Sequence, residues 1–336
     1  MAHRIGVIAN AGSGRNAREA AAIERAMAVL GPEARLVWWE AGRDIGLLVR
    51  ELEAEGCTTI VAAGGDGTVG AVAAALCGGR LALAVLPLGT FNFFARGLGL
   101  PEDPEGAARA ILAGRQRRIA IGEVNGQVFL NNASLGLYPA ILKEREAIYD
   151  RWGRYRVLAH WSVVRSFLRF QRPMRVVIRT AEGERRRVTP LIFVARSAYQ
   201  LARYGLEGAA AISGDRFALF VATGGHRPRD LFRLAWRLVT RRIQPGRDVE
   251  LIESARVEVE VAGRAPLVAF DGEKRRMRAP ITFLIRPDAL TIVVPEATDA
   301  EEPAGSAAGR EPERGARLAG PSQKARNGGK REGSQG

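Results

Sequence analysis

Three short segments of the sequence combine glycines with hydroxyl, amide or carboxylate side chains, and each follows an apolar run. They are "NAGSGRN" (Asn10–Asn16), "GGDGT" (Gly64–Thr68) and "PLGTFNFFAR" (Pro87–Arg96). Glycines let backbone N–H groups approach phosphate oxygens, and the start of a helix favours anions. The hydroxyl groups of Ser13, Thr68 and Thr90 add donors. The three segments therefore predict a phosphate-binding site.

Asp66 is the one carboxylate among the glycines of the second segment. A carboxylate next to phosphate is repulsive unless a divalent cation bridges the two, so Asp66 is predicted to bind Mg²⁺ directly or through water. The same residues also suit a turn followed by a helix N-cap, and for this segment alone that structural alternative stays open. The spacing matches neither the dinucleotide fingerprint nor the P-loop.

The first third of the chain alternates strands with helices. The expected strands are Arg4–Ala9, Arg35–Trp39, Thr59–Ala63 and Leu81–Leu86, and the expected helices are Ala17–Leu30, Asp44–Glu55, Thr68–Leu76 and one from Pro104 to about Ala113. This alternation predicts an α/β domain with an open, mostly parallel sheet. Ligands bind beyond the carboxyl ends of such strands, so the three segments should face one crevice.

After about Arg118 the pattern becomes that of an antiparallel β-sandwich. Asn125-Gly126 predicts a hairpin turn, and a helical stretch follows from Tyr149 to Phe170. The expected strands then are "MRVVIRT", "RRVTPLIFVA", "RFALFVA", "RVEVEVAG", "PLVAF", "ITFLIR" and "LTIVV". We assign residues 1–120 to the α/β domain and 121–284 to the sandwich. The sequence leaves open whether residues 285–297 complete the α/β domain. Residues 298–336 are expected to be disordered because they hold almost no large apolar residue.

A second candidate for chemistry is the late segment "AFDGEKRRMRAP". Asp271-Gly272 is a turn signal between strands, which is a purely structural explanation. Phosphoryl transfer, however, also needs an acceptor for the hydroxyl proton, and Glu273 is a candidate for that role.

These motifs resemble those of the diacylglycerol kinase catalytic-domain family, which includes bacterial lipid kinases and sphingosine kinases. The resemblance rests on "NAGSG", "GGDGTVG", "PLGTFNFFARGLGLP", "NNASLG" and "DGE", and it spans about residues 4 to 295. It implies ATP with Mg²⁺ and transfer of phosphate to a lipid hydroxyl. It also implies that Glu273 is the general base, with Asp271 beside it. The residues that would hold ATP are Asn10, Ser13, Gly14, Gly64, Gly65, Asp66, Gly67, Thr68, Thr90 and Asn92.

Several positions depart from the family pattern. Gly70 stands where the family has asparagine, and Phe91 and Phe93 replace the glycine and the acidic residue or histidine of "GTGNDFA". The family's acidic "DDG" turn is here "ISGDRFAL", so Asp215 is the one carboxylate left for a structural Mg²⁺. These departures keep open a catalytically weak or inactive nucleotide- or lipid-binding protein on the same fold. An NAD kinase, which shares "GGDGT", is a further alternative.

The basic composition favours an anionic partner, and an arginine bias of the genome is the alternative explanation. The formal net charge is +14, and the helix Pro228–Ile243 has arginines four residues apart at Arg229, Arg233, Arg237 and Arg241. Arginine beside tryptophan on an amphipathic helix suits an anionic membrane surface, although an ordinary solvated helix face has the same pattern. Nucleic acid is not an expected partner. Without a signal peptide or a membrane-spanning run, we expect a cytoplasmic, peripherally membrane-associated enzyme. A homodimer is compatible with the sequence.

Overall fold

The computed structural model describes residues 4–10, 17–40, 42–136, 173–224, 230, 233–234, 236–237, 240–263 and 265–296. These described residues belong to one compact unit. The expected helix Tyr149–Phe170 and the expected disordered segment 298–336 lie outside the described residues. No helix within the described residues is long and apolar enough to cross a membrane.

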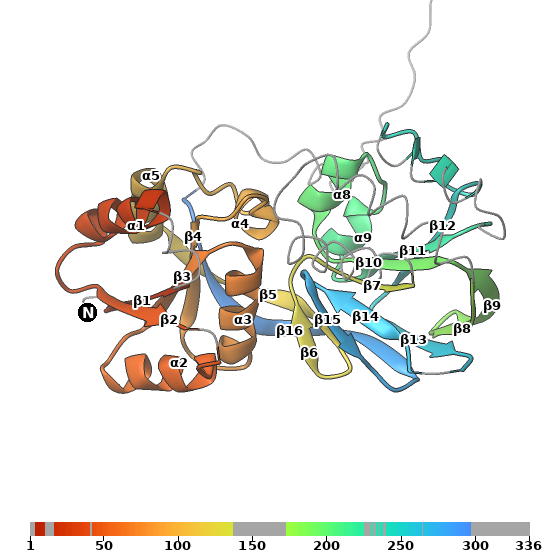
Figure 1. Cartoon of the computed structure of the whole chain (residues 1–336), viewed down its shortest axis with the longest axis horizontal. Helices are drawn as coiled ribbons and strands as arrows, with labels where there is room; N and C mark the ends of the chain where they lie inside the picture. The colour runs from red at the N-terminus through yellow and green to blue at the C-terminus, as the bar shows by residue number, and fades with distance from the viewer. Residues whose placement is uncertain are drawn as a thin grey trace, which may run out of the picture. The chain divides into compact units, whose positions relative to one another are not determined.

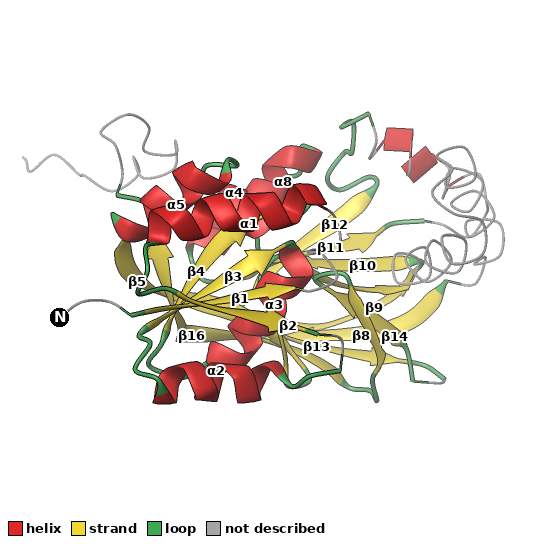
Figure 2. Ribbon diagram, turned by 60° about the vertical axis from the view of Figure 1, so that its left-hand side comes forward, coloured by secondary structure: helices red, strands yellow, loops and turns green. Residues whose placement is uncertain are grey.

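The first part of the chain forms the expected parallel sheet. Strands β1 (Ile5–Asn10), β2 (Arg35–Trp39), β3 (Thr59–Gly64) and β4 (Ala82–Pro87) pair in the order β2-β1-β3-β4. Helices α1 (Ala17–Leu30) and α5 (Pro104–Leu112) cover one face, and α2 (Ile45–Ala54) and α3 (Asp66–Leu76) cover the other (Figure 2). A short helix, α4 (Phe93–Gly97), follows β4 and was not predicted from the sequence.

The helix ends follow the local signals. Asp44 caps α2 by accepting a hydrogen bond from the Gly46 N–H at 2.7 Å, and Asp103 caps α5 through Gly106 at 2.6 Å. Helix α3 begins at Asp66, two residues before the predicted start, so Asp66 belongs to the first turn of the helix.

The second part of the chain contains the expected antiparallel strands and two more, Val249–Ser254 and Glu273–Arg276, that were not predicted from the sequence. Strands β5 (Arg115–Val124) and β6 (Gln127–Phe129) form the hairpin that Asn125-Gly126 predicts, with positive φ at both turn residues. One sheet has the order β12-β11-β10-β7-β14-β15. Its strands are β12 (Val249–Ser254), β11 (Phe217–Ala222), β10 (Leu191–Ala195), β7 (Asn132–Gly136), β14 (Leu267–Phe270) and β15 (Glu273–Arg276). Helices α8 (Ala198–Tyr204) and α9 (Ala209–Ser213) cover its outer face.

Two strand predictions need correction. The segment "RRVTPLIFVA" is not one strand, because Pro190 separates β9 (Gly183–Thr189) from β10 and the two belong to different sheets. The segments "ITFLIR" and "LTIVV" are not two strands, because they form one strand, β16 (Ile281–Val294), of 14 residues.

Strand β16 connects the two parts of the molecule. Its first half pairs with β13 (Arg256–Val261), its second half pairs with β4, and β5 runs antiparallel to it along most of its length. A register shift between Arg286 and Leu290 lets the strand bend at this junction. The parallel sheet therefore continues through β16 and β13 into β8 (Met174–Thr180) and β9, as Figure 1 shows.

The helix predicted at Pro228–Ile243 is described only in part, and within the described residues Arg237 does not belong to an exposed arginine stripe. Arg237 donates through Nη1 to both carboxylate oxygens of the buried Asp248 at 2.7 Å, and Gln244 N donates to the same carboxylate. Burial alone would raise the pKa of Asp248, but these donors lower it below its usual range. Arg241 lies in a turn with a φ of 54°.

Replacing Arg237 with glutamine should lower the free energy of unfolding by about 2 kcal/mol, because the carboxylate of Asp248 would stay buried without its cation. Arg242→Gln, at an exposed position of the same segment, is the matched control and should change stability by less than about 0.5 kcal/mol. Chemical denaturation measures both values. Equal stability of the two variants would show that the ion pair contributes nothing.

Candidate functional site

The first and second glycine segments meet at the carboxyl ends of β1 and β3. Asn10 ends β1, and its side-chain Nδ2 donates to the Thr68 hydroxyl oxygen at 3.4 Å. Thr68 is buried in the first turn of α3. The predicted grouping of Asn10 with the "GGDGT" residues is therefore present, while Ser13 and Gly14 lie outside the described residues.

The second and third segments touch backbone to backbone. A Cβ atom on Gly89 would lie 2.4 Å from the Gly65 Cα and 2.7 Å from the Asn92 Oδ1. The Leu88 N–H also donates to the Gly64 carbonyl at 3.0 Å. At this contact the glycines are needed by the packing of two loops, in addition to any approach of phosphate.

Asn92 holds the third segment in shape. It has a φ of 48°, and its side chain both accepts from the Gly89 N–H at 3.0 Å and donates to the Gly89 carbonyl at 2.9 Å. Asn92 is buried, whereas Thr90 beside it is exposed. Of these two predicted ATP-binding residues, Thr90 is the one whose side chain is available to a ligand.

Asp66 joins three elements. Its Oδ1 accepts from the Phe94 N–H at 3.2 Å, in the first turn of α4, and from Nδ2 of Asn131 at 3.4 Å. Arg96 on α4 lies close enough for its charge to interact with that of Asp66. The Asp66 carboxylate therefore fixes the first turn of α4, the helix that follows β4. This contact gives the carboxylate among the glycines a structural role.

Asp271 connects the late "DGE" segment to the same place. Asp271 and Gly272 form the tight turn between β14 and β15, with φ values of 43° and 91°. The Asp271 carboxylate accepts three backbone N–H groups, from Leu130 at 2.5 Å, Asn131 at 2.9 Å and Asn132 at 3.0 Å. Burial raises the pKa of Asp271 to about 6; the three N–H donors oppose this rise, and the negative charge of Asp66 adds to it.

Glu273 directly follows this turn, and its side chain is exposed. The Glu273 carboxylate makes no hydrogen bond to the described part of the chain. It lines a pocket of about 80 Å³ together with Gly67, Gly70 and Asp271. The Asp271 carboxylate lies next to Gly70 of α3, because a Cβ on Gly70 would be 3.8 Å from Oδ2, an ordinary van der Waals contact. The predicted meeting of "GGDGT" with "DGE" is thus observed, and Asp271 accepts three N–H groups whereas the Glu273 carboxylate accepts none from the described residues.

The structure gives Asp215 a different partner from the predicted metal. Asp215 lies in a turn with positive φ, and its Oδ1 accepts from Nη2 of Arg196 at 2.8 Å. The same guanidinium donates to the carbonyl oxygens of Ile212 and Ala120 at 3.0 and 3.1 Å. An arginine therefore supplies the cation at this turn. Among the described residues, no group of three or more His, Cys, Asp or Glu side chains could hold a metal ion.

Sequence reasoning missed three residues that support the site. Asn131 contacts Asp66, Asn132 donates to the buried Gln200 at 3.0 Å, and the Arg196 N–H donates to the Asn131 carbonyl at 2.8 Å. The adjacent asparagines of "NNASLG" were visible in the sequence as part of the resemblance. Their partners lie more than 60 positions away in the chain, so no local pattern could assign their roles.

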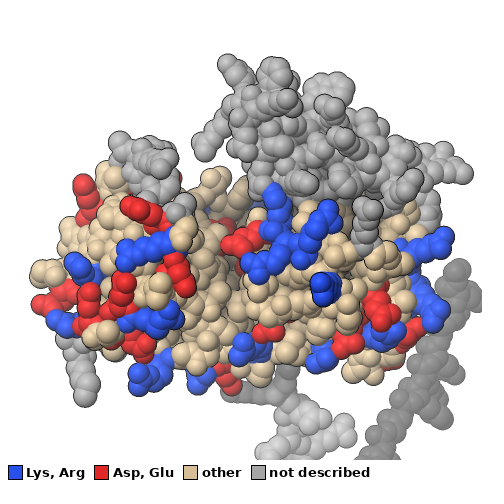
Figure 3. All heavy atoms as spheres, turned by 60° about the horizontal axis from the view of Figure 1, so that its bottom comes forward, with Lys and Arg blue, Asp and Glu red and all other residues tan. Residues whose placement is uncertain are grey.

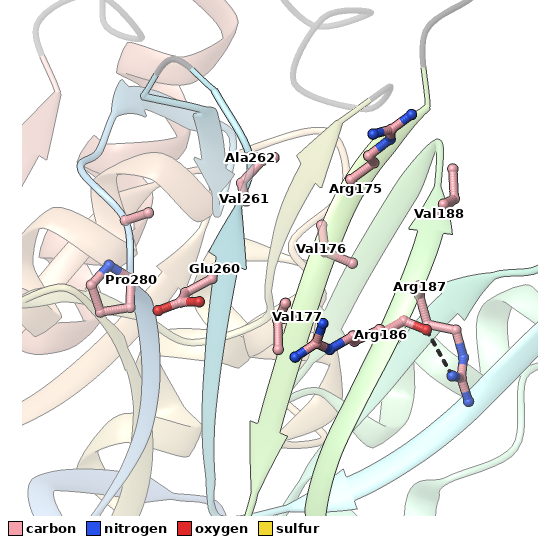
Figure 4. A pocket seen from close by; sticks show the side chains of 11 residues that line it. Arg175, Val176, Val177, Arg186, Arg187, Val188, Glu260, Val261, Ala262 and Pro280 are labelled. Carbon is pink, nitrogen blue, oxygen red and sulfur yellow. Dashed lines mark hydrogen bonds between the residues drawn. The ribbon is translucent and has the colours of Figure 1, made fainter.

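A larger hollow, of about 590 Å³, lies on the outer face of β8, β9 and β13 (Figure 4). Two of its arginines are already paired, Arg186 with Glu184 and Arg187 with Glu250. None of the predicted site residues lines it. On the face that Figure 3 shows, basic and acidic side chains are interspersed over the described residues. The positive net charge therefore does not single out this hollow as the functional site.

Comparisons with known proteins agree with the motifs. Residues 4–124 match the model of the diacylglycerol kinase catalytic domain. A protein named "Probable lipid kinase YegS-like" from Pseudomonas aeruginosa is 52% identical over 102 residues, which cover 30% of this chain and 33% of that protein. One of the same name from Chromohalobacter salexigens is 40% identical over 119 residues, covering 34% and 38%. The chain thus spans about a third of the length of these relatives.

The fold is shared over a longer part of the chain. A crystal structure of a putative diacylglycerol kinase from Bacillus anthracis has a TM-score of 0.66 at 18% identity, and the match covers 87% of this chain and 97% of that one. The predicted resemblance is therefore confirmed for residues 4–124, and the predicted fold class is confirmed for both the α/β part and the antiparallel part.

Replacing Asp271 with asparagine should destabilise the protein by about 1–3 kcal/mol, because the amide NH₂ group cannot accept the third N–H bond. The effect should also depend on pH. The pKa of Asp271 is raised in the folded state from 3.8 to about 6, so the folded state takes up a proton first as the pH falls. The stability that Asp271 contributes is therefore greatest below the pKa that it has in the unfolded chain. This stability is lost as the pH rises through about 6, the pKa of Asp271 in the folded state.

The wild type should therefore lose about 1 kcal/mol relative to Asp271→Asn between pH 5 and pH 8. Urea unfolding of both proteins at the two pH values measures this difference. Parallel pH dependences would contradict the raised pKa, and equal stabilities at both pH values would contradict the role of the three hydrogen bonds.

Proposed function

We propose that this protein is an ATP-dependent lipid kinase, which transfers the γ-phosphate of ATP to a hydroxyl group of a lipid. The observation that carries the proposal is the convergence of the motif segments. Asp66 binds the Phe94 N–H and Asn131, Asp271 binds the N–H groups of residues 130–132, and Glu273 shares a pocket with Gly67. The diacylglycerol kinase match over residues 4–124 supports the same reaction class.

In this proposal the glycine loops hold the phosphates of ATP. The N–H groups of "GGDGT" lie where β3 ends and α3 begins, a position that favours anions. In "PLGT" the N–H groups of Leu88 and Gly89 already donate to Gly64 and Asn92, so they are not available to phosphate. Thr90 is exposed and can donate to a phosphate oxygen. Asn10, Thr68 and Asn92 act within the protein, because their side chains hold the loops in position.

The residues around Asp66 fit a divalent cation. Asp66 Oδ2 makes no hydrogen bond within the described part of the chain, and Oδ1 of Asn131 is buried without a partner. These two oxygens are of the kind that Mg²⁺ prefers. When bound, Mg²⁺ would neutralise phosphate charge during transfer.

Glu273 is the proposed general base. It removes the proton of the lipid hydroxyl as the oxygen forms a bond to the γ-phosphorus, and the bond from that phosphorus to the β–γ bridging oxygen breaks to release ADP. Asp271 is less suited to this role than Glu273, since its carboxylate already accepts three backbone N–H groups, two of them on Oδ1. Its proposed role is to fix the turn that carries Glu273.

A lipid acceptor and a membrane surface remain part of the proposal. Phe91 and Phe93 belong to the third segment and stack with ring centroids 5.5 Å apart; Phe91 is 56% exposed and Phe93 is half-buried. A partly exposed aromatic pair at the site suits an apolar acceptor better than a water-soluble one. The net charge of +14 favours an anionic bilayer.

Transfer of labelled γ-phosphate from ATP and Mg²⁺ tests the proposal. The acceptors are diacylglycerol, a sphingoid base, phosphatidylglycerol and a polyprenol, each in anionic and in neutral vesicles, with NAD as a soluble acceptor. We expect a labelled lipid, formed faster on anionic vesicles. Labelled NAD instead would establish an NAD kinase, and ATP binding without transfer to any acceptor would contradict the kinase reaction.

Glu273→Gln should lower kcat on the accepted lipid by about 10²–10⁴-fold with little change in ATP affinity, because glutamine cannot accept the proton. Asp66→Asn should weaken both Mg²⁺-dependent ATP binding and transfer. Glu207→Gln, an exposed glutamate outside the pocket, is the control and should keep wild-type activity. Full activity of Glu273→Gln would reject Glu273 as the base.

A further inference from the structure

A pocket separate from that of Glu273 lies between α4, β5 and α8. Helices α4 and α8 lie side by side (Figure 1), and a Cβ on Gly97 would be 3.4 Å from the Tyr199 Cβ. The pocket has a volume of about 220 Å³ and shares no lining residue with the pocket of Glu273. Much of its lining is apolar, from Phe94, Leu98, Ile119, Leu130 and Ile212.

Arg196 lines this pocket and is unusually constrained. Its side chain is 9% exposed, and its two terminal nitrogens are held by the Ile212 and Ala120 carbonyls and by Asp215. The remaining donor, Nε, is buried and has no hydrogen-bond partner. A buried N–H without a partner is unfavourable, so an acceptor that reaches it from the pocket would relieve an existing penalty.

Arg117 adds a second cation at the same pocket. It is an exposed residue of β5 and makes no ion pair or side-chain hydrogen bond within the described part of the chain. The charge of Arg196 is balanced by Asp215, but the charge of Arg117 is not balanced by any described side chain. The pocket therefore combines a net positive charge and an unused buried donor with an apolar wall.

We propose that this pocket binds a lipid phosphate, with the phosphate group on Arg117 and Nε of Arg196 and the first methylene groups of the chain on the apolar wall. A phosphate monoester offers several strong acceptor oxygens and a charge near −2, which matches two arginine donors. The apolar wall gives additional affinity to a ligand with a hydrocarbon chain over free phosphate.

The choice of a lipid phosphate rests on the proposed kinase function, since it is the chemistry of that reaction's product. The backbone also relates the two sites. Phe94 and Leu130 line the pocket, and their N–H groups are the ones that Asp66 and Asp271 accept. A lipid phosphate in the pocket would therefore contact the two residues whose N–H groups hold the Asp66 and Asp271 carboxylates.

Calorimetric binding of dihexanoyl phosphatidate, below its micelle concentration and without ATP, tests the proposal. Dihexanoylglycerol and inorganic phosphate are the matched ligands that lack the phosphate and the chain. We expect phosphatidate to bind at least tenfold more tightly than either. Arg117→Gln should weaken its binding about tenfold, which corresponds to one charge-assisted hydrogen bond.

Arg115→Gln is the matched control, because Arg115 is an exposed arginine of the same strand outside the pocket. It should bind phosphatidate as the wild type does. Ala198→Phe, which fills the pocket from α8, should abolish binding, and thermal unfolding of each variant shows whether it is folded.

No binding to the wild type, or equal affinity in Arg117→Gln and Arg115→Gln, would overturn the proposal. Binding of inorganic phosphate as tight as that of phosphatidate would also overturn it in favour of a simple anion site. Because ATP is absent, these outcomes are independent of the kinase assay. A folded protein that binds phosphatidate but transfers no phosphate would refute the proposed reaction and keep the pocket.

Discussion

The candidate site depends on the carboxylate of Asp271 and the three backbone N–H groups that it binds. These bonds fasten the turn between β14 and β15 to residues 130–132, which lie more than 130 positions earlier in the chain. Asn131 then contacts Asp66, and Asp66 binds the Phe94 N–H. One chain of polar contacts therefore orders the glycine loops, α4 and the turn that carries Glu273. The burial that this arrangement requires is also why the pKa of Asp271 is raised.

The sheets provide the frame for these contacts. Strand β16 pairs with β4 at one end and with β13 at the other, so the two parts of the chain share one hydrogen-bonded strand. Arg196 adds a second link, because its guanidinium joins β5, α9 and the Asp215 turn while its N–H binds Asn131. Where a carboxylate-rich turn would need a metal ion for this link, a guanidinium provides the positive charge and several directed donors. Strand β16 and Arg196 thus both hold the two parts of the chain together around the site.

The features that were predictable from the sequence have local causes. Asn125-Gly126 specifies its hairpin, Asp103-Pro104 specifies the start of α5, and the order of the glycine motifs indicated that they meet at one sheet edge. The predictions failed where tertiary structure decides. Pro190 divides one apolar run between two sheets, and Pro287 does not break β16, because residues 286–288 are exposed at the register shift.

The roles of site residues followed the same rule. Residue types identified Asp66 and Glu273 as carboxylates with possible chemistry, but only long-range contacts separate Asp271, which accepts three N–H groups, from Glu273, which accepts none from the described residues. Asn92 was predicted to bind ATP. In the structure its side chain forms two hydrogen bonds with Gly89 and holds its own loop in shape.

A crystal structure of the protein with a non-hydrolysable ATP analogue and Mg²⁺ tests the central claim, that these segments form one phosphoryl-transfer site. The account predicts phosphates on the "GGDGT" N–H groups and on Thr90, Mg²⁺ within reach of Asp66, and the γ-phosphate facing Glu273. A nucleotide bound elsewhere, or a γ-phosphate facing away from the Asp271–Glu273 turn, would contradict it.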